Sequence, residues 1–238
     1  MVDGAAIEQA ALRAWPADEE ERNETWLLRA NGGYTKRANS AYALESADST
    51  ELSTLRTWYA ARGLPLVIRE SSLCPNPALS QELARRSFRR FDETLIMTGN
   101  TGGDIDQRMH QAELEPWIGA YTQFEGATKG DQRRHAKLVT SIPGHVLTAV
   151  LTSHDRAVAC GLAVVEGPHM GLFDIATDQS QRRMGYGRSL VQSMLAWGAM
   201  QGAAIAYLQV LERNSAAIAL YQGLGFREAY RNWYWIQQ

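Results

Sequence analysis

The sequence predicts an α/β protein, on three observations. Short apolar runs of strand length alternate along the chain with segments whose apolar residues recur every three or four positions, as in helices that cover a sheet. The chain has 238 residues, of which 45% are hydrophobic and 21% charged, the balance of an ordinary globular protein with a substantial core. A glycine-containing turn at residues 178–187 joins one apolar strand directly to a helix, an arrangement typical of α/β proteins.

The composition argues against several classes of partner. A formal net charge of −2 gives no general attraction to nucleic acid or to an anionic membrane. No apolar run approaches the roughly 20 residues that span a bilayer. The N-terminal segment is acidic and has no basic stretch followed by an apolar core, so we expect no signal peptide and a cytoplasmic location. Cys74 and Cys160 are isolated and no histidines have ligand spacing, which predicts free thiols and no metal site.

The first half alternates between strands and helices. Helices are expected at residues 6–14, 52–59 and 76–88, and strands at residues 26–29, 38–44, 66–68 and 93–98. Residues 29–40 are unusually polar for this setting, with three cations and two asparagines. Two interpretations stay open: a solvated hairpin, or a wall facing the substrate in which Arg37 and Asn39 orient a polar acceptor.

The second half follows a polar link at residues 104–115, which predicts a boundary between domains 1–112 and 113–238. Helices are expected at residues 117–124, 131–139, 185–201 and 215–222, and strands at residues 145–153, 157–165, 170–177, 205–211 and 229–236. Asn214 is a good N-cap for the last helix, and Gly225 suits a left-handed position after its end.

The turn between residues 177 and 190 carries the pattern Arg182-x-x-Gly185-x-Gly187. The first N–H groups of a helix lack intrahelical partners, so a strand, a glycine turn and a helix start together form an anion site suited to a diphosphate. No Gly-Lys-Ser/Thr follows, which excludes a P-loop, and Leu190 stands where a dinucleotide fingerprint needs its third glycine. An ordinary glycine turn remains the alternative.

This pattern resembles the acyl-CoA pyrophosphate loop of the GCN5-related N-acetyltransferase (GNAT) superfamily. One helix and one strand later, Asn214-x-x-Ala217-x-x-Leu220-Tyr221-x-x-x-Gly225-Phe226 is similar to the second GNAT signature. The resemblance covers about residues 116–238. Within it, residues 172–187 and 203–226 are most similar to the ribosomal-protein N-alanine acetyltransferase branch.

The resemblance implies a GNAT fold, which is a central mixed and mostly antiparallel sheet flanked by helices and splayed between two parallel strands. The first half resembles more loosely the two-part bacterial GNAT proteins. The whole chain is therefore expected to be a tandem: a degenerate GNAT-like domain at residues 1–112 without a cofactor loop, and a complete GNAT domain at residues 113–238.

The same resemblance implies acetyl-CoA as co-substrate, with no metal. The pantetheine arm would lie along a strand edge and the pyrophosphate on loop amides and arginines. The cofactor-binding residues it implies are Ile175, Ala176, Thr177, Arg182, Arg183, Met184, Gly185, Tyr186, Gly187, Arg188, Asn214 and Ala217.

The chemistry implied is transfer of an acetyl group to a primary amine. Tyr221 would protonate the departing thiolate, although a core tyrosine is the alternative. The N-alanine branch has a base glutamate where this chain has Gln209, which cannot accept a proton and is assigned here to substrate binding. Asp174 and Glu212 are substitute bases. For Asp174 a solvated or helix-facing carboxylate is the alternative, and ordered water would make a base unnecessary.

The leading hypothesis is an acetyl-CoA-dependent N-acetyltransferase whose acceptor is a small-molecule or peptide amine. A non-catalytic acyl-CoA-binding sensor is the alternative, and the absent glutamate at Gln209 favours it slightly. Neither nucleic acid nor membrane is expected as a partner, and the sequence predicts no oligomeric state.

Overall fold

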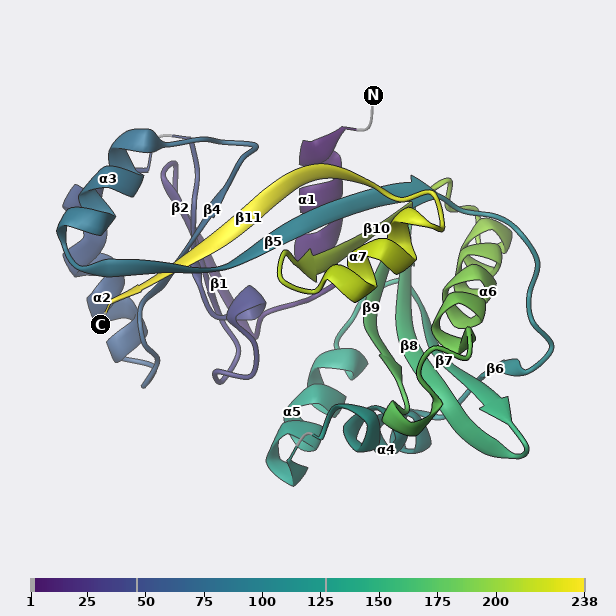
Figure 1. The fold of residues 1–238 in the computed structure, drawn as a ribbon. Helices are drawn as coiled ribbons and strands as arrows, with labels where there is room; N and C mark the ends of the chain where they lie inside the picture. The colour runs from purple at the N-terminus through teal and green to yellow at the C-terminus, as the bar shows by residue number, and fades with distance from the viewer. Residues whose placement is uncertain (1–2, 46, 127, 238) are drawn as a thin grey trace. The chain divides into compact units, whose positions relative to one another are not determined.

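The computed structural model describes residues 3–45, 47–126 and 128–237 (Figure 1). The chain forms two compact units whose segments interleave. Unit 1 holds the N-terminal residues through Ala14, Met97–Val210 and Asn214–Ala229. Unit 2 holds Trp15–Ile96, Leu211–Arg213 and the segment from Tyr230 to the C-terminus. The sequence boundaries 1–112 and 113–238 stay a prediction, because these units are groupings in space and each draws on both halves of the chain.

Unit 2 is a sheet with two helices. Its elements are β1 (Glu19–Arg22), β2 (Trp26–Ala30), β3 (Ala41–Ala43), α2 (Leu52–Ala60), β4 (Val67–Ser71), α3 (Pro77–Arg85), the first part of β5 (Phe88–Asn100) and the last part of β11 (Arg227–Gln237), with short 3-10 turns at Lys36–Ala38 and Ser49–Glu51. The strand order is β1-β2-β3-β4-β11-β5. β3 and β4 are parallel, whereas β1–β2, β2–β3 and β4–β11 are antiparallel.

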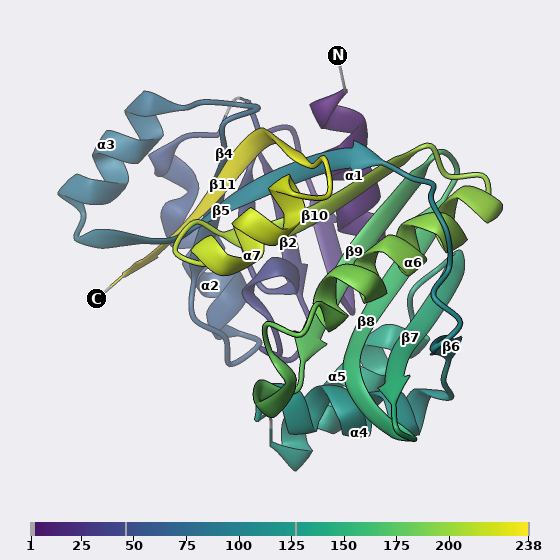
Figure 2. The same ribbon diagram turned by 45° about the vertical axis from the view of Figure 1, so that its right-hand side comes forward.

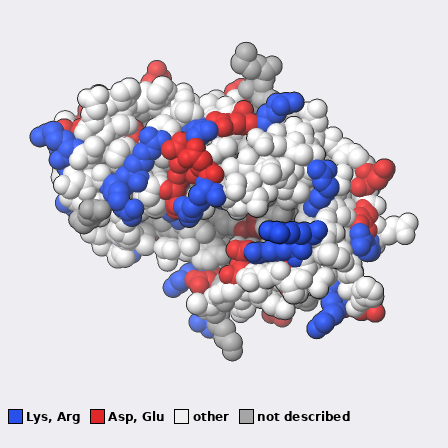
Figure 3. All heavy atoms as spheres, in the orientation of Figure 1, with Lys and Arg blue, Asp and Glu red and all other residues white. Residues whose placement is uncertain are grey.

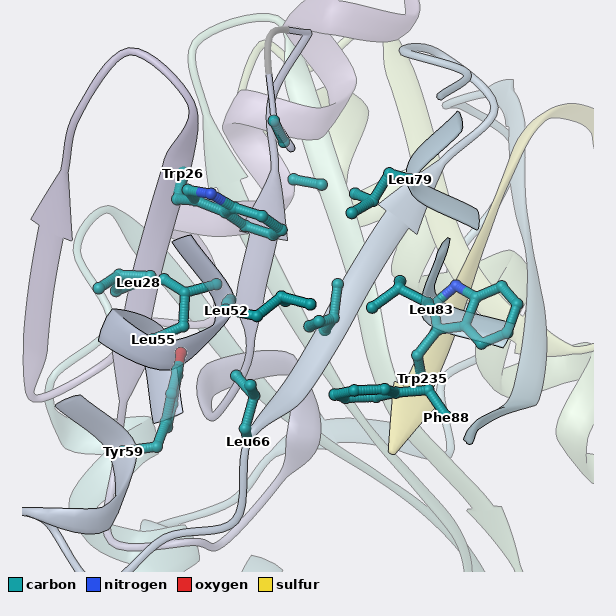
Figure 4. Packing of buried hydrophobic residues seen from close by; sticks show 14 residues of the cluster. Trp26, Leu28, Leu52, Leu55, Tyr59, Leu66, Leu79, Leu83, Phe88 and Trp235 are labelled. Atoms are coloured by element: carbon teal, nitrogen blue, oxygen red, sulfur yellow. The ribbon is translucent and has the colours of Figure 1, made fainter. Parts of the chain in front are cut away.

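The core of unit 2 explains why these segments fold. Apolar side chains from α2, α3 and the strands form one buried cluster, in which Trp26, Tyr59 and Leu83 are fully buried (Figure 4). The fully buried carboxylate of Glu70 accepts hydrogen bonds from the indole Nε1 atoms of Trp233 and Trp235 at 2.8 and 2.5 Å. The Ser80 hydroxyl donates to the same carboxylate at 2.9 Å. This polar centre therefore links β4, α3 and the end of β11.

Unit 1 contains the strand, turn and helix that the sequence singled out. Its elements are α1 (Gly4–Arg13), the end of β5, β6 (Met109–Gln111), α4 (Leu114–Glu125), α5 (Lys129–Thr140), β7 (His145–Ser153), β8 (Arg156–Glu166), β9 (His169–Thr177), a 3-10 turn at Gln179–Gln181, α6 (Tyr186–Met200), β10 (Ile205–Leu211), α7 (Ser215–Gln222) and the start of β11. The strand order is β5-β10-β9-β8-β7-β6. The ladder is antiparallel from β6 through β9 and parallel between β9 and β10.

Helices cover both faces of the unit 1 sheet. α6 packs on β7, β8 and β9, and α4 packs on the same three strands from the other side, with α5 against α4 and α1 against β9 (Figure 2). Trp117 of α4 is fully buried, and so are Leu190, Val191 and Met194 of α6. The apolar face that predicted the helix beginning near Gly185 is the face that packs on the sheet.

The two parallel strands separate part-way along their length. In the described register, Ile205–Leu208 of β10 pair with His169–Leu172 of β9 and the pairing stops there, although both strands continue. Residues 173–177 of β9 therefore have a free edge on the side of β10. This is the splayed, mixed sheet that the resemblance implied, and the predicted fold class is confirmed.

The structure also differs from the sequence expectations. β1 and β6 were not predicted, because Glu19–Arg22 is polar and exposed at every position and Met109–Gln111 lies in a stretch that reads as a polar link. Phe88 begins β5 rather than ending a helix, and residues 38–40 precede a short β3. β1 and β6 lie at the two ends of the strand order, where a single ladder partner holds them without an apolar pattern of their own. None of the described helices is long and apolar enough to cross a membrane.

Candidate active site

A groove of about 710 Å³ lies in unit 1, bounded by the end of β9, the loop and first turn of α6, and α7. All the predicted cofactor-binding residues except Met184 line it. Met184 instead lies on the surface, with 67% of its area exposed. The structure therefore brings together residues from both sequence motifs, among them Asn214, Ala217, Leu220 and Tyr221 of the second.

The N-terminus of α6 faces this groove without a side-chain cap. Gly185 is the N-cap residue, with a left-handed φ of 85° and no side chain to accept a hydrogen bond. The first backbone bond at this end is donated by Ser189 N–H to the Gly185 carbonyl, at 3.0 Å. The N–H groups of the first turn precede that bond and are the orphan donors that every helix start leaves. Four other helices, α1, α3, α5 and α7, have a capping side chain at this position.

Gly187 permits a close approach between the helix and the strand. A Cβ atom at this position would lie 3.2 Å from Oγ1 of Thr177 and 3.7 Å from a methyl of Leu220. The missing side chain keeps the groove open where β9, α6 and α7 meet. A ligand can therefore approach the helix backbone there, as the glycine pattern predicts.

Three arginines surround the N-terminus of α6. Arg182, Arg183 and Arg188 are exposed and line the groove. Arg188 donates to the Gly223 carbonyl at 3.0 Å, which holds its guanidinium beside α7. Figure 3 shows basic side chains gathered over the region between α7 and the start of α6. Positive charge and unpaired N–H groups thus coincide at one end of the groove.

The opposite wall is α7. Asn214 is its N-cap, as predicted, and the Oδ1 atom accepts from Ala217 N–H at 3.2 Å. Tyr221 is 7% exposed, lines the groove and packs against Phe226 with ring centroids 5.9 Å apart. Burial raises the pKa of the Tyr221 phenol to about 12, so the phenol keeps its proton at neutral pH. Within the described residues its hydroxyl has no hydrogen-bond partner.

Asp174 lies beside the groove, next to its lining residue Ile175. Its φ of 53° is left-handed, at an interruption in the pairing of β8 with β9. Its Oδ2 atom is 2.8 Å from Nε2 of His135, which lies on α5 and is 2% exposed. Sequence reasoning did not single out His135, because nothing in the local pattern of α5 links it to a strand 39 residues later.

The other two candidates for proton transfer have different surroundings. The Nε2 atom of Gln209 is buried without a hydrogen-bond partner among the described residues, one position after the β9–β10 pairing ends. Glu212 belongs to unit 2, where it accepts from Arg231 at 2.7 Å. Asp174 lies next to the groove-lining residue Ile175, whereas Glu212 is ion-paired in unit 2, so the geometry favours Asp174 of the two.

Arg37 and Asn39 lie in unit 2. Asn39 is buried, and its Oδ1 atom accepts from the N–H groups of Asn31 and Gly33 at 2.7 and 3.0 Å. Its Nδ2 atom donates to the carbonyls of Asn31 and Thr35. All four hydrogen-bonding positions of this amide are thus committed to the loop. The Arg37 guanidinium lies 4.9 Å from the ring centroid of Trp15. The substrate-binding role of both residues stays a prediction.

The whole chain is similar to known acetyltransferases. A family model described as "Probable histone acetyltransferase Rv0428c C-terminal" matches residues 3–235. The chain is 29% identical over 250 residues to the uncharacterized N-acetyltransferase YobR of Bacillus subtilis (strain 168), covering 100% of both proteins. It is 36% identical over 121 residues to the ribosomal protein bS18-alanine N-acetyltransferase of Escherichia coli (strain K12), covering 48% of this chain and 82% of that protein.

The fold also matches that of a solved N-acetyltransferase structure. The GCN5-related N-acetyltransferase from Kribbella flavida matches with a TM-score of 0.68 and 16% identity, over 98% of this chain and 93% of that chain. The predicted resemblance, fold class and enzyme class are confirmed by these matches. The chain belongs to the family described by the Rv0428c C-terminal model and is an enzyme of the GNAT N-acetyltransferase superfamily.

Proposed function

We propose that the protein transfers the acetyl group of acetyl-CoA to a primary amine of a small molecule or a peptide. The observation that carries this proposal is the uncapped N-terminus of α6, which faces a groove together with three exposed arginines and the free edge of β9. A diphosphate suits the uncapped helix N-terminus, and an amide-bearing chain suits the free edge of β9. Coenzyme A contains both groups in one molecule.

The residues present fit that ligand along the whole groove. Ile175, Ala176 and Thr177 supply strand backbone to the pantetheine amides, in the manner of an added edge strand. The amides from residues 182–188 hold the pyrophosphate, and the arginines among them add charge. Asn214 and Ala217 form the opposite wall. The Asn214 Oδ1 atom is used by the helix cap, which leaves its amide N–H groups for the ligand.

The transfer itself needs a proton acceptor and a proton donor. The acceptor amine is an ammonium ion at neutral pH and must lose a proton before its nitrogen can attack the thioester carbon. Asp174 takes this proton in our proposal. As the C–S bond breaks, Tyr221 protonates the sulfur, and the second proton lost by the nitrogen restores the phenol. A phenol whose pKa is about 12 is in the donating form throughout the neutral range.

Negative charge near the groove favours one class of acceptor amine. Glu125 lines the groove and Asp174 lies beside it, so the field near the reacting end favours a cationic acceptor. The E. coli relative is named for an alanine of ribosomal protein bS18, and the family description names a histone acetyltransferase. A peptide amine is therefore among the acceptors to test, beside small alkylamines. Gln209, with its unsatisfied Nε2 donor, is assigned to an acceptor atom of the substrate.

A second candidate is a non-catalytic acyl-CoA sensor, which Gln209 in place of the family glutamate favours. The two candidates share the binding groove and differ only in turnover. Slow thiol release with every amine, combined with tight binding of acetyl-CoA, would select the sensor. Release that saturates with an amine selects the enzyme.

Two measurements on the purified chain test the proposal. Isothermal titration calorimetry with acetyl-CoA should show binding by the wild type, and Gly187→Val should weaken it at least tenfold. Gly119→Val is the matched control, because a Cβ atom at that helical glycine meets nothing within 4 Å. A thiol-release assay with a panel of amines and N-terminal peptides then measures turnover. No heat with acetyl-CoA, or equal effects of the two glycine variants, would contradict the proposed site.

A further inference from the structure

We infer that His135 is a positioning residue that orients the Asp174 carboxylate for proton transfer from the acceptor amine. This inference rests on the proposed function and adds to it a residue that neither sequence motif contains. Its basis is the hydrogen bond between α5 and β9, 2.8 Å long, in a nearly dry setting. His135 is 2% exposed and the Asp174 side chain is 13% exposed.

The direction of this hydrogen bond follows from the chemistry of its two atoms. An ionised carboxylate only accepts hydrogen bonds, so Nε2–H of His135 donates to Oδ2 of Asp174. Oδ2 is then committed to the histidine, and Oδ1 is the oxygen that takes the substrate proton in our inference. A carboxylate anchored through one oxygen presents the other in a fixed direction, which is what an efficient proton acceptor needs.

Aromatic side chains of α4 fix the imidazole. The ring centroids of Trp117 and Tyr121 lie 5.3 and 5.0 Å from that of His135, both edge-on. Trp117 in turn donates from Nε1 to the Gly161 carbonyl of β8 at 3.0 Å. The histidine is therefore held by two rings, one of which is bonded to the strand next to β9. Such support is what keeps a catalytic group in one rotamer.

The backbone of β9 is shaped at the same place. Cys160 pairs with Ala176 and Leu162 with Phe173, so the single residue Gly161 opposes both Asp174 and Ile175. This is a β-bulge, which re-aims a side chain that a regular strand would place elsewhere. Asp174 takes the left-handed backbone conformation there, which is uncommon for a residue with a Cβ atom and is concentrated at functional sites.

Titratable groups of α5, α4 and β8 gather in this region. His135 of α5 bonds to Asp174, and the charges of Asp174 and of Glu125, on α4, both act on the Cys160 thiol of β8. Burial, with the charges of Asp174 and Glu125, raises the pKa of the Cys160 thiol, which therefore stays neutral. Cys160 is thus excluded as the base at neutral pH, and the proton released by the ammonium passes to Asp174 and from there to solvent.

The experiment compares two replacements of the histidine. His135→Gln keeps an N–H donor of similar reach, whereas His135→Phe keeps the ring packing and removes the donor. We expect His135→Phe to lower kcat about 10- to 100-fold while the KM for acetyl-CoA stays within about twofold, as for loss of a proton-transfer contribution. His135→Gln should recover most of the loss. Arg133→Ala, at an exposed position of the same helix, is the matched control.

A double-mutant cycle separates positioning from packing. If His135 acts through Asp174, His135→Phe in an Asp174→Asn background should cost less than about twofold further. If the fold losses in kcat of the two single variants multiply in the double variant, the inference is overturned. A folded His135→Phe with the kcat of the wild type would also overturn it. If His135→Phe unfolds, the ¹⁵N chemical shifts of the His135 ring are compared between the wild type and Asp174→Asn. An Nε2–H tautomer that is present in the wild type and changes in Asp174→Asn supports the hydrogen bond to Asp174. A tautomer that is the same in both proteins overturns the inference. A wild type that turns over no amine refutes the proposed function instead.

Discussion

Tyr221→Phe tests the chemistry while leaving the structure almost untouched. The substitution removes a hydroxyl group that has no hydrogen-bond partner among the described residues. The ring keeps its place against Phe226, at a centroid distance of 5.9 Å. Because no donor or acceptor is orphaned, we expect the free energy of unfolding to change by less than about 0.5 kcal/mol. The affinity for acetyl-CoA should stay within about twofold.

The effect on turnover should be much larger. Loss of a general acid lowers kcat by about 10²- to 10⁴-fold, which corresponds to about 3–5 kcal/mol of transition-state stabilisation. The assay is thiol release at saturating acetyl-CoA and amine, beside calorimetric binding and a thermal melt of the same preparation. Near wild-type kcat with intact binding would refute the acid role and make Tyr221 a packing residue. A fall in both binding and melting temperature would contradict the premise that the ring keeps its place.

Three further predictions use the same preparations. Replacing Arg182 and Arg183 together by alanine should raise the Kd for acetyl-CoA about 3- to 30-fold, and by less at high salt, as for the loss of two exposed ion pairs. Arg227→Ala is the control, and an equal rise in Kd for the control and the double variant would contradict the role of the two arginines. Glu70→Leu should lower the free energy of unfolding in urea by about 2–4 kcal/mol, because the indole N–H groups of Trp233 and Trp235 lose their acceptor. Glu70→Gln keeps an acceptor oxygen and should lose less, and equal losses in the two variants would point to packing alone. Above pH 10 the wild type should lose stability that Tyr221→Phe keeps. The pKa of this phenol rises from its ordinary value of 10.0 in the unfolded chain to about 12 in the folded one. The stability difference between the two proteins should therefore grow to about 2 kcal/mol by pH 12, and parallel alkaline curves would refute it.

Much of the site was predictable because its determinants are local. A strand, a turn and a helix start follow one another within about twenty residues, so the uncapped helix start at Gly185 is encoded by neighbours along the chain. The same is true of the Asn214 cap and of Gly225, whose φ of 88° is the left-handed value predicted for it. Caps and glycine turns depend on backbone geometry within a few residues. Sequence patterns report such geometry well.

The features that the sequence did not reveal depend on partners far along the chain. β11 was expected as a closing strand, but only the structure shows that Asn232–Ile236 pair with Val67–Ser71 of β4. The bulge at Asp174 is a property of two strands in register, and an isolated strand pattern contains no trace of it. His135 belongs to a helix whose pattern is mostly polar, so its burial against β9 could not be inferred from spacing.

β9 explains why the proposed cofactor edge and the proposed base lie side by side. Its parallel pairing with β10 stops at Leu172, and its pairing with β8 is interrupted just after Phe173. The first change leaves main-chain groups of residues 175–177 free for an amide-bearing ligand, and the second turns Asp174 toward α5. Both changes fall within a few residues, so the strand presents a binding edge and an ionisable side chain at one point. A regular, fully paired strand could supply neither, because its backbone groups would be used and its side chains would only alternate between the two faces.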